Sequence, residues 1–339
     1  QSPIPMKNLL TQIKNNYNVI IIKIINFYII IYIIKKYYIY MSEKPKVYFT
    51  KVVSPEKLVE IYKKLDIKLE GNIAVKVHSG EKGNKNFIKP EFMKPIVDYL
   101  DGTIVETNTS GPEAQSERTT NEKHKKLLEE HGWTKVFKKV EILDSEKPDE
   151  ELDIPNGIIL KKNYIGSKSK NFDGYLVLSH FKGHAMGGYG GALKQLSIGF
   201  GSRLGKTLMH SGGKSKDPED FWKTFCTDKE FKECMADCAF SVVNKFRGKM
   251  AFINVMKNIS IDCDCDGNAK PPCMDDMGIL ASLDPVAIDK ACLDLIYNSE
   301  QPGKKELIER IEQKLGPHII ECSVQLGTGK ADYELINID

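Results

Sequence analysis

Short hydrophobic runs alternate along this chain with segments that repeat apolar residues every three or four positions. The short runs predict strands at 46–53, 72–78, 103–108, 173–179 and 249–256. The amphipathic segments predict helices at 55–65, 90–100, 119–131, 192–198 and 284–297. This alternation predicts an α/β fold with a mostly parallel or mixed sheet flanked by helices, either as one body or as two α/β lobes with a cleft.

Local signals support these elements and place polar residues at strand ends. The helices at 55–65 and 284–297 each begin with a capping residue followed by a proline. The run 173–179 is the most apolar, so we expect it at the centre of the sheet. His78 ends one predicted strand and His180 follows another, and such sheets bind ligands beyond the carboxyl ends of their strands.

The first 40 residues differ in composition from the rest of the chain. The stretch 18–40 is rich in Ile, Tyr, Asn and Lys, and its apolar core is near the minimum length for a membrane span. Lys23 and Asn26 interrupt that core. We interpret residues 1–40 as upstream sequence translated in frame with a true start at Met41, and an N-terminal anchor is the alternative.

The remaining residues, 41–339, would form a single domain that could divide into two lobes near 145–170. The first 40 positions hold five lysines and no acidic residue, so removing them lowers the formal net charge by five, from +3 to −2. The shorter chain has no basic excess, and we expect no nucleic-acid partner. We also expect no membrane partner if Met41 is the true start.

Eight cysteines without a secretory signal indicate reduced thiols and a cytoplasmic location. Three of them, Cys263, Cys265 and Cys273, lie in one short acidic stretch with a turn between the second and the third. Loops of this kind hold iron–sulfur clusters or zinc. The aspartates beside the Cys-x-Cys pair would raise the thiol pKa unless a cation lies among them, which favours a bound metal.

A glycine-rich loop follows the predicted central strand. Its glycines, Gly187, Gly188, Gly190 and Gly191, allow the backbone to approach a ligand closely. The helix that follows would direct its free N–H groups back into the loop, with Lys194 one turn in, and this arrangement binds anions. The alternative is a packing loop whose glycines let the helix and the sheet approach each other.

Histidines provide the remaining candidates for chemistry. His180 and His184 flank the glycine loop and could bind metal or transfer protons near neutral pH. With His78 and Lys194, they form the predicted catalytic set. We predict that His318 is ordinary. We predict that the cysteines outside the acidic stretch pack in the core. The Cys-x3-Cys spacing of Cys234 and Cys238 on a helix can also ligate metal. The cysteines outside the stretch are Cys226, Cys234, Cys238, Cys292 and Cys322.

Six segments carry a resemblance to a known family: 76–84, 105–111, 119–133, 179–206, 259–296 and 326–339. Together they resemble domain-of-unknown-function family 362, an uncharacterised prokaryotic family associated with iron–sulfur centres. The resemblance implies a cluster of the [4Fe–4S] type at Cys263, Cys265 and Cys273, with zinc as the alternative. Many relatives carry an inserted ferredoxin segment with C-x2-C-x2-C-x3-C-P spacing, and this chain resembles the shorter form without it.

Three functions remain open at this point. The first is an iron–sulfur protein with an oxidoreductase or electron-transfer role, which acts on a small anionic substrate or with a redox partner protein. The second is a non-redox isomerase or epimerase that uses two of His78, His180 and His184 on a small hydroxy acid; the arrangement is similar to that of the nickel-pincer lactate racemase family. The third is a structural metal-binding module, so the sequence leaves open whether the protein is an enzyme.

Overall fold

The computed structural model describes Phe27 and residues 43–339. The predictions of a non-native segment or an anchor concern residues 1–40, which lie outside the described residues except for Phe27. Residues Pro45–Asp339 form one compact unit. A division into lobes near 145–170 stays a prediction. In the part of the chain that the structure describes, no helix is both long and apolar enough to cross a bilayer.

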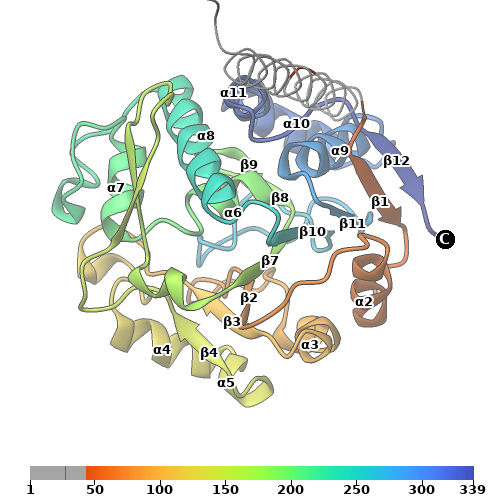
Figure 1. The fold of residues 1–339 in the computed structure, drawn as a ribbon, viewed down its shortest axis with the longest axis horizontal. Coiled ribbons are helices and arrows are strands. Elements are labelled where there is room, and N and C mark those ends of the chain that lie inside the picture. Colours follow the sequence, from red (N-terminus) through yellow and green to blue (C-terminus); the bar gives the residue numbers. More distant parts are fainter. Residues whose placement is uncertain (1–26, 28–42) are drawn as a thin grey trace, which may run out of the picture. The chain divides into compact units, whose positions relative to one another are not determined.

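An eight-stranded sheet forms the middle layer of this unit (Figure 1). In chain order its strands are β1 (Lys46–Thr50), β2 (Ile73–Lys76), β3 (Thr103–Glu106), β4 (Val140–Ile142), β7 (Gly174–His180), β10 (Met250–Met256), β11 (Gly278–Ser282) and β12 (Glu334–Asn337). Their spatial order is β12-β1-β11-β10-β7-β2-β3-β4. Only β11 runs antiparallel to its neighbours, and the other adjacent pairs are parallel. The predicted α/β fold with a mainly parallel sheet is therefore confirmed.

Helices cover both faces of the sheet (Figure 1). One face carries α2 (Pro55–Lys63), α3 (Pro90–Tyr99), α4 (Asn121–Glu130) and α5 (Trp133–Val136). The other face carries α6 (Ala192–Ser197), α7 (Arg203–His210), α8 (Asp228–Lys245), α9 (Pro285–Tyr297), α10 (Lys304–Gln313) and α11 (His318–Leu326). The predicted caps are present, because the Ser54 hydroxyl accepts from the N–H of Lys57 and the Asp284 carboxylate accepts from that of Val286.

The apolar core lies in two layers, one on each side of the sheet. Successive side chains of a strand point to opposite faces, so a central strand must be apolar on both. In β7, Tyr175 and Val177 join one layer, and Leu176 and Leu178 join the other. All seven residues of β7 are buried, which confirms the prediction that this run is central.

Two hairpins stand apart from the main sheet. The first pairs β5 (Glu150–Asp153) with β6 (Lys162–Ile165), and the second pairs β8 (Lys182–His184) with β9 (Gly188–Gly190). The second hairpin follows β7 directly, so it holds His184 and the glycine loop near the carboxyl end of the central strand. Three short 3-10 helices complete the described elements: Glu113–Gln115, Ser167–Asn171 and Pro218–Asp220.

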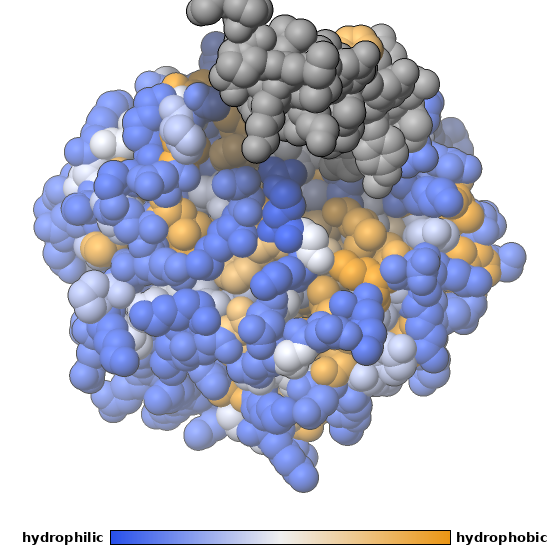
Figure 2. Space-filling model, in the orientation of Figure 1, coloured by the Kyte–Doolittle hydropathy of each residue, from blue (hydrophilic) through white to orange (hydrophobic). Residues whose placement is uncertain are grey.

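The outer surface is largely polar on the face that Figure 2 shows. Hydrophobic residues on this face gather mainly towards β1 and β12. Leu335 of β12 and Val52, just after β1, are both exposed. Because β12 is an edge strand, these side chains lie near the open edge of the sheet.

Candidate metal centre and its cavity

The carboxyl ends of four parallel strands meet at one edge of the sheet. β2 leads to His78, β3 ends at Glu106, and β7 ends at His180. β10 leads into the loop 257–277, which carries the Cys-x-Cys pair. These strands are neighbours in the order β10-β7-β2-β3. The polar strand ends of the sequence are therefore brought together where α/β sheets bind ligands.

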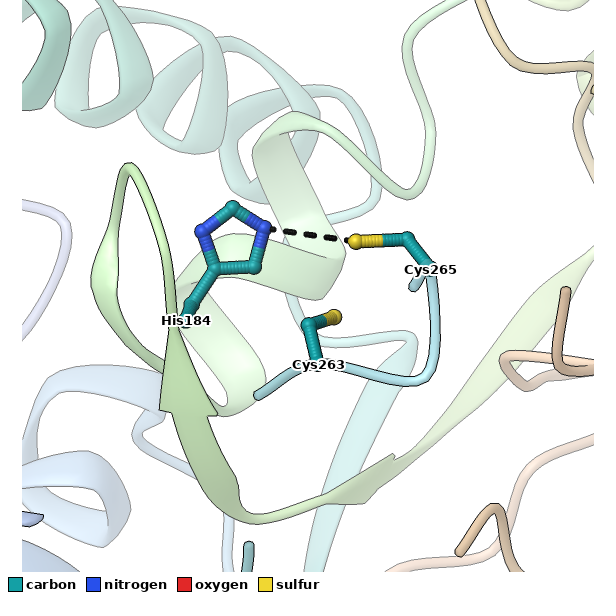
Figure 3. Close-up of side chains that lie close together, drawn as sticks. All are labelled: His184, Cys263 and Cys265. Carbon is teal, nitrogen blue, oxygen red and sulfur yellow. Dashed lines mark hydrogen bonds between the residues drawn. The ribbon is translucent and has the colours of Figure 1, made fainter. Parts of the chain in front are cut away.

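Three potential metal ligands converge at this edge (Figure 3). His184 projects from β8, whereas Cys263 and Cys265 come from the loop after β10. The His184 Nε2 atom and the two Sγ atoms all lie within 4.8 Å of one another. The distance from His184 Nε2 to Cys265 Sγ is 3.6 Å. Cys263 is buried and Cys265 is exposed, so a metal ion held by this group would be reached from one side.

Backbone contacts determine which nitrogen of His184 carries its proton. The Nδ1 atom accepts from the N–H groups of Met186 at 3.1 Å and Gly187 at 2.7 Å. Burial, reinforced by the charge of Lys194, lowers the pKa of His184 to about 4, so the ring is neutral at pH 7. Its single proton therefore lies on Nε2, the nitrogen that faces Cys265. A metal that binds at Nε2 has to displace this proton.

A buried charge network holds the residue between the two cysteines. The Asp264 carboxylate accepts from Lys182 Nζ at 2.7 Å and from His180 Nδ1 at 2.9 Å. Burial raises the pKa of Asp264, but the charges of His180 and Lys182 outweigh it and hold the pKa below its ordinary value. His180 Nε2 also lies 2.5 Å from the carbonyl oxygen of Lys257, so both ring nitrogens face acceptors. His180 links β7 to the cysteine loop and is not among the described residues that line the adjoining cavity.

The two cysteines differ in their protonation. Burial raises the pKa of Cys263, but a hydrogen bond with Cys265 and the charges of Lys194 and Lys182 hold it well below its ordinary value. The same hydrogen bond, together with the charge of Cys263, raises the pKa of Cys265. Cys263 is therefore the more acidic thiol of the pair. We expected from the sequence that only a metal could offset the neighbouring aspartates. Instead, Asp264 is paired internally and lysines supply the positive charge.

Cys273 does not join this group. Its Sγ lies 3.4 Å from the carbonyl oxygen of Ile259. Its half-buried position raises its pKa. The groups of close metal-ligand atoms among the described residues do not include it. The turn at 266–272 thus separates the third predicted ligand from the other two.

The loop after β2 holds the cysteine loop in place. The Glu81 N–H donates to the carbonyl oxygen of Asp264 at 2.8 Å. The Asn84 side chain donates to the carbonyl oxygen of Asp266 at 2.8 Å. The two loops also approach closely at Gly267, where a Cβ atom would lie 2.2 Å from the carbonyl oxygen of Lys82. The position of the sulfur atoms therefore depends on a loop far away in the sequence.

The glycine loop packs against helices and does not face the cavity. The N–H groups of Ala192 and Leu193 donate to the Asp289 carboxylate at 2.7 and 2.9 Å, so α9 already caps the first turn of α6. A Cβ atom on Gly191 would lie 2.4 Å from Asp289 Oδ1. Gly188 adopts a φ of +80°, which favours glycine. None of the four predicted loop glycines is among the described residues that line the cavity.

A cavity of about 600 Å³ lies beside the Cys/His group. Its wall contains four residues that the sequence predicted as site residues: His78, His184, Lys194 and Cys265. The volume is within the range of about 300–1,000 Å³ that is usual for small-molecule sites. Burial, reinforced by the charge of Arg118, lowers the pKa of His78 well below its ordinary value, so this ring is neutral as well.

The sequence analysis missed three basic residues of the cavity wall, Lys82, Arg118 and Lys206. Lys206 Nζ donates to Thr107 Oγ1 at 2.7 Å and to the carbonyl oxygens of Asn108 at 2.7 Å and Gly201 at 2.5 Å. Burial lowers the pKa of Lys206 to about 7. All three of its protons have partners, so Lys206 ties segments of the wall together. Arg118 lies just before a predicted helix and outside the segments that carry the family resemblance, and Lys206 ends one of those segments without being recognised as a site residue.

The other cysteines lie elsewhere. Cys234, Cys238 and Cys292 are buried in the apolar core, as predicted. Cys322 of α11 is buried too, but its sulfur belongs to a second group with His318 of α11 and Glu233 of α8, whose ligand atoms lie within 4.8 Å of one another. The sequence did not indicate this second group, because its members come from helices that are far apart in the chain.

The fold and site define a three-layer α/β protein with a Cys/His group at the carboxyl edge of its sheet. Residues 73–294 match the family described as "Domain of unknown function (DUF362)", and the chain belongs to that family. This confirms the resemblance that the sequence motifs carry. No curated protein matches the chain.

Two solved structures are similar at low identity. One is the lactate racemase apoprotein from Thermoanaerobacterium thermosaccharolyticum, with 12% identity and a TM-score of 0.36, covering 61% of this chain and 50% of that one. The other is a protein from Thermotoga maritima, with 9% identity and a TM-score of 0.37, covering 80% of this chain and 58% of that one. The chain thus spans 50% of the first protein and 58% of the second.

Proposed function

We propose that this protein binds a transition-metal ion through Cys263, Cys265 and His184 and acts on a small anionic substrate in the adjoining cavity. The observation that carries the proposal is the convergence of the three ligand atoms within 4.8 Å beside that cavity. Sulfur and imidazole donors suit zinc, iron or copper. A cytoplasmic location, where thiols stay reduced, suits this chemistry.

The ligand spacing fits a single ion. Typical bond lengths in a tetrahedral zinc site separate a thiolate sulfur from an imidazole nitrogen by roughly 3.6 Å, and the distance from Cys265 Sγ to His184 Nε2 is 3.6 Å. A [4Fe–4S] cluster, the first candidate from the sequence, takes more thiolates. Because Cys273 lies outside the group, such a cluster would need that loop to rearrange.

The residues around the group have distinct tasks in this proposal. A bound metal would supply a Lewis acid or carry electrons. The low pKa of Cys263 favours its thiolate form, and Cys265 would release one proton on metal binding. His184 is neutral and would release none, because its proton would move from Nε2 to Nδ1 when Nε2 binds the metal. Lys194 and Lys182 offset the charge that the deprotonated ligands leave behind. His180 and Asp264 orient the loop, and Lys194 would also attract the anionic substrate.

Metal analysis of protein purified without oxygen tests the proposal. We expect about one metal ion per chain in the wild type, and loss of it in a Cys263→Ser/Cys265→Ser variant and in His184→Ala. Cys273→Ser is the matched control and should keep its metal. The proposal fails if the double variant retains the wild-type metal content. Acid-labile sulfide in the wild type, together with metal loss in Cys273→Ser, would establish a cluster and overturn the single ion.

A second candidate is the isomerase or epimerase, and one observation favours it. His78 and His184 line the same cavity, and burial keeps both rings neutral at pH 7. Such rings can exchange protons with a small hydroxy acid. Exchange of solvent deuterium into the Cα–H bond of lactate, followed by NMR, tests this function. It should disappear in His78→Gln, and absence of exchange in the wild type, as purified and reconstituted with metal, would contradict proton transfer to this substrate.

A further inference from the structure

Arg118 is the cavity residue with the most unused hydrogen-bonding capacity. It is only 5% exposed, yet it lines the cavity. Its Nε donates to Glu81 Oε2 at 3.1 Å. Among the described residues, its two terminal guanidinium nitrogens have no hydrogen-bond partner. Burying a guanidinium is costly unless its donors are paired, so a buried arginine with free terminal nitrogens points to a missing acceptor.

Glu81 cannot be that acceptor, because its own oxygens are already occupied. Its Oε1 accepts from the N–H groups of Lys82 at 2.9 Å and Glu117 at 3.3 Å. Its Oε2 accepts from the Ser116 hydroxyl and from Arg118 Nε. Glu81 therefore fixes the guanidinium from one side and leaves the edge formed by the terminal nitrogens for another group.

Glu106 is also committed elsewhere. Its carboxylate accepts from Lys76 Nζ at 2.8 Å and from the backbone N–H and hydroxyl of Ser79 at 2.8 and 3.0 Å. Glu117 and Asp266 are the other acidic residues that the described wall contains, and neither forms an ion pair with Arg118. Among the described residues, therefore, no carboxylate accepts a hydrogen bond from the terminal nitrogens of Arg118.

A second cation with spare donors lines the same cavity. Lys194 is 9% exposed, and among the described residues its Nζ donates only to Cys263 Sγ, at 3.7 Å. Arg118 thus presents a planar pair of N–H donors to the cavity, and Lys194 presents a compact positive charge to the same cavity. The fork of an arginine matches the two oxygens of a carboxylate with two parallel hydrogen bonds.

We propose that Arg118 binds a carboxylate group of a small organic acid, with its two terminal nitrogens on the two oxygens, and that Lys194 contacts another oxygen of the same molecule. Glu81 is the positioning residue that holds Arg118. This assignment rests on the proposed function, because it names the class of substrate that the proposed function places in that cavity. Since Arg118 and Lys194 both line the wall that contains Cys265, the bound acid would lie beside the metal group.

Calorimetric titration of the full chain tests the assignment. The probes are lactate, malate, succinate and inorganic phosphate. We expect at least one of the carboxylates to bind, and Arg118→Gln to weaken that binding by about tenfold or more, since it removes a charged bidentate pair. Arg118→Lys keeps the positive charge and a partner for Glu81 but loses the two parallel N–H donors. We therefore expect it to bind carboxylates nearly as weakly as Arg118→Gln does. Arg247→Gln, at an exposed arginine that follows the C-terminal end of α8 and does not line the cavity, is the matched control and should bind like the wild type.

The outcomes separate this inference from the metal proposal. The titration is repeated on the Cys263→Ser/Cys265→Ser variant, and the metal content of Arg118→Gln is measured in parallel. Carboxylate binding in the double variant, lost again on adding Arg118→Gln, supports the inference even if the metal proposal fails. Wild-type affinity in Arg118→Gln, binding of none of the carboxylates, or tighter binding of phosphate than of every carboxylate would overturn it.

Discussion

The described residues contain two Cys/His groups with similar ligand spacing and very different surroundings. The first, Cys263, Cys265 and His184, lies on loops at the edge of the sheet beside a cavity. The second, Glu233, His318 and Cys322, lies between two helices and contributes no residue to the described cavity. Close ligand atoms alone therefore do not distinguish a functional centre from a packing contact.

The difference lies in how each histidine is satisfied. His318 has a carboxylate on each ring nitrogen, with Glu321 at 3.0 Å from Nδ1 and Glu233 at 3.4 Å from Nε2. These partners complete its hydrogen bonding without any ion. His318 Nε2 also lies 3.4 Å from Cys322 Sγ. His184 differs in its other partners, because its Nδ1 accepts from backbone N–H groups and its Nε2 faces the sulfur of Cys265 beside the cavity. The second group thus has the properties of an ion-pair network, and only the first combines soft ligands with access for a substrate.

The largest effect is expected from breaking the charge network under the first group. Asp264→Ala would leave His180 and Lys182 buried without their shared carboxylate, which costs about 3–5 kcal/mol of unfolding free energy. Urea denaturation of the metal-free protein measures it. Asp98→Ala, which removes an exposed i,i+4 pair with Lys94, is the control and should cost less than about 1 kcal/mol. Equal losses in the two variants would contradict the view that Asp264 anchors the loop.

A smaller effect is expected from the pH dependence of His184. Burial lowers its pKa in the folded protein to about 4, whereas an unfolded chain has a value of about 6.5. The unfolded state therefore binds a proton first as the pH falls. The stability that depends on neutral His184 is fully present above about pH 6.5 and is lost as the pH falls towards 4.

His184→Gln should accordingly flatten the curve of unfolding free energy against pH in that window. The flattening is partial, because burial also lowers the pKa of His124 and His210, to about 3. Urea unfolding of the metal-free wild type and variant across the window measures the slope. An unchanged slope would mean that His184 is not held neutral in the folded protein.

The smallest effect is expected at the second group. His318→Ala removes partly exposed ion pairs with Glu233 and Glu321, and such pairs contribute about 0–1 kcal/mol. We expect metal content and carboxylate binding to stay at wild-type levels. If His318→Ala removes the metal while Cys263→Ser/Cys265→Ser retains it, the assignment of the two groups must be exchanged.

Much of the fold could be predicted because its strongest patterns are local. The apolar run of β7 identified the central strand, and the caps at Ser54 and Asp284 marked where α2 and α9 begin. The reversed direction of β11 was not predictable in the same way. It depends on pairing with β1 and β10, which are distant in sequence from each other, and its short apolar run gives no direction.

The site was predicted in part for the same reason. The Cys-x-Cys spacing and the histidine after β7 are visible in the sequence, and the structure brings Cys263, Cys265 and His184 together. Cys273 could not be placed, because the path of the turn before it determines where its sulfur lies. Arg118 was not recognised as a site residue because it lies in an irregular segment. Its significance depends on Glu81, a contact between two loops.

The docking of the loop after β2 onto the cysteine loop has a consequence for protein engineering. Residues 257–277 obtain their shape from Glu81 and Asn84 and from a glycine-to-backbone approach that tolerates no side chain. A transplanted cysteine loop would arrive in another scaffold without these supports. Any attempt to move this centre into a new host should therefore carry residues 78–84 with it, as well as residues 180–184, which supply His184 and the partners of Asp264.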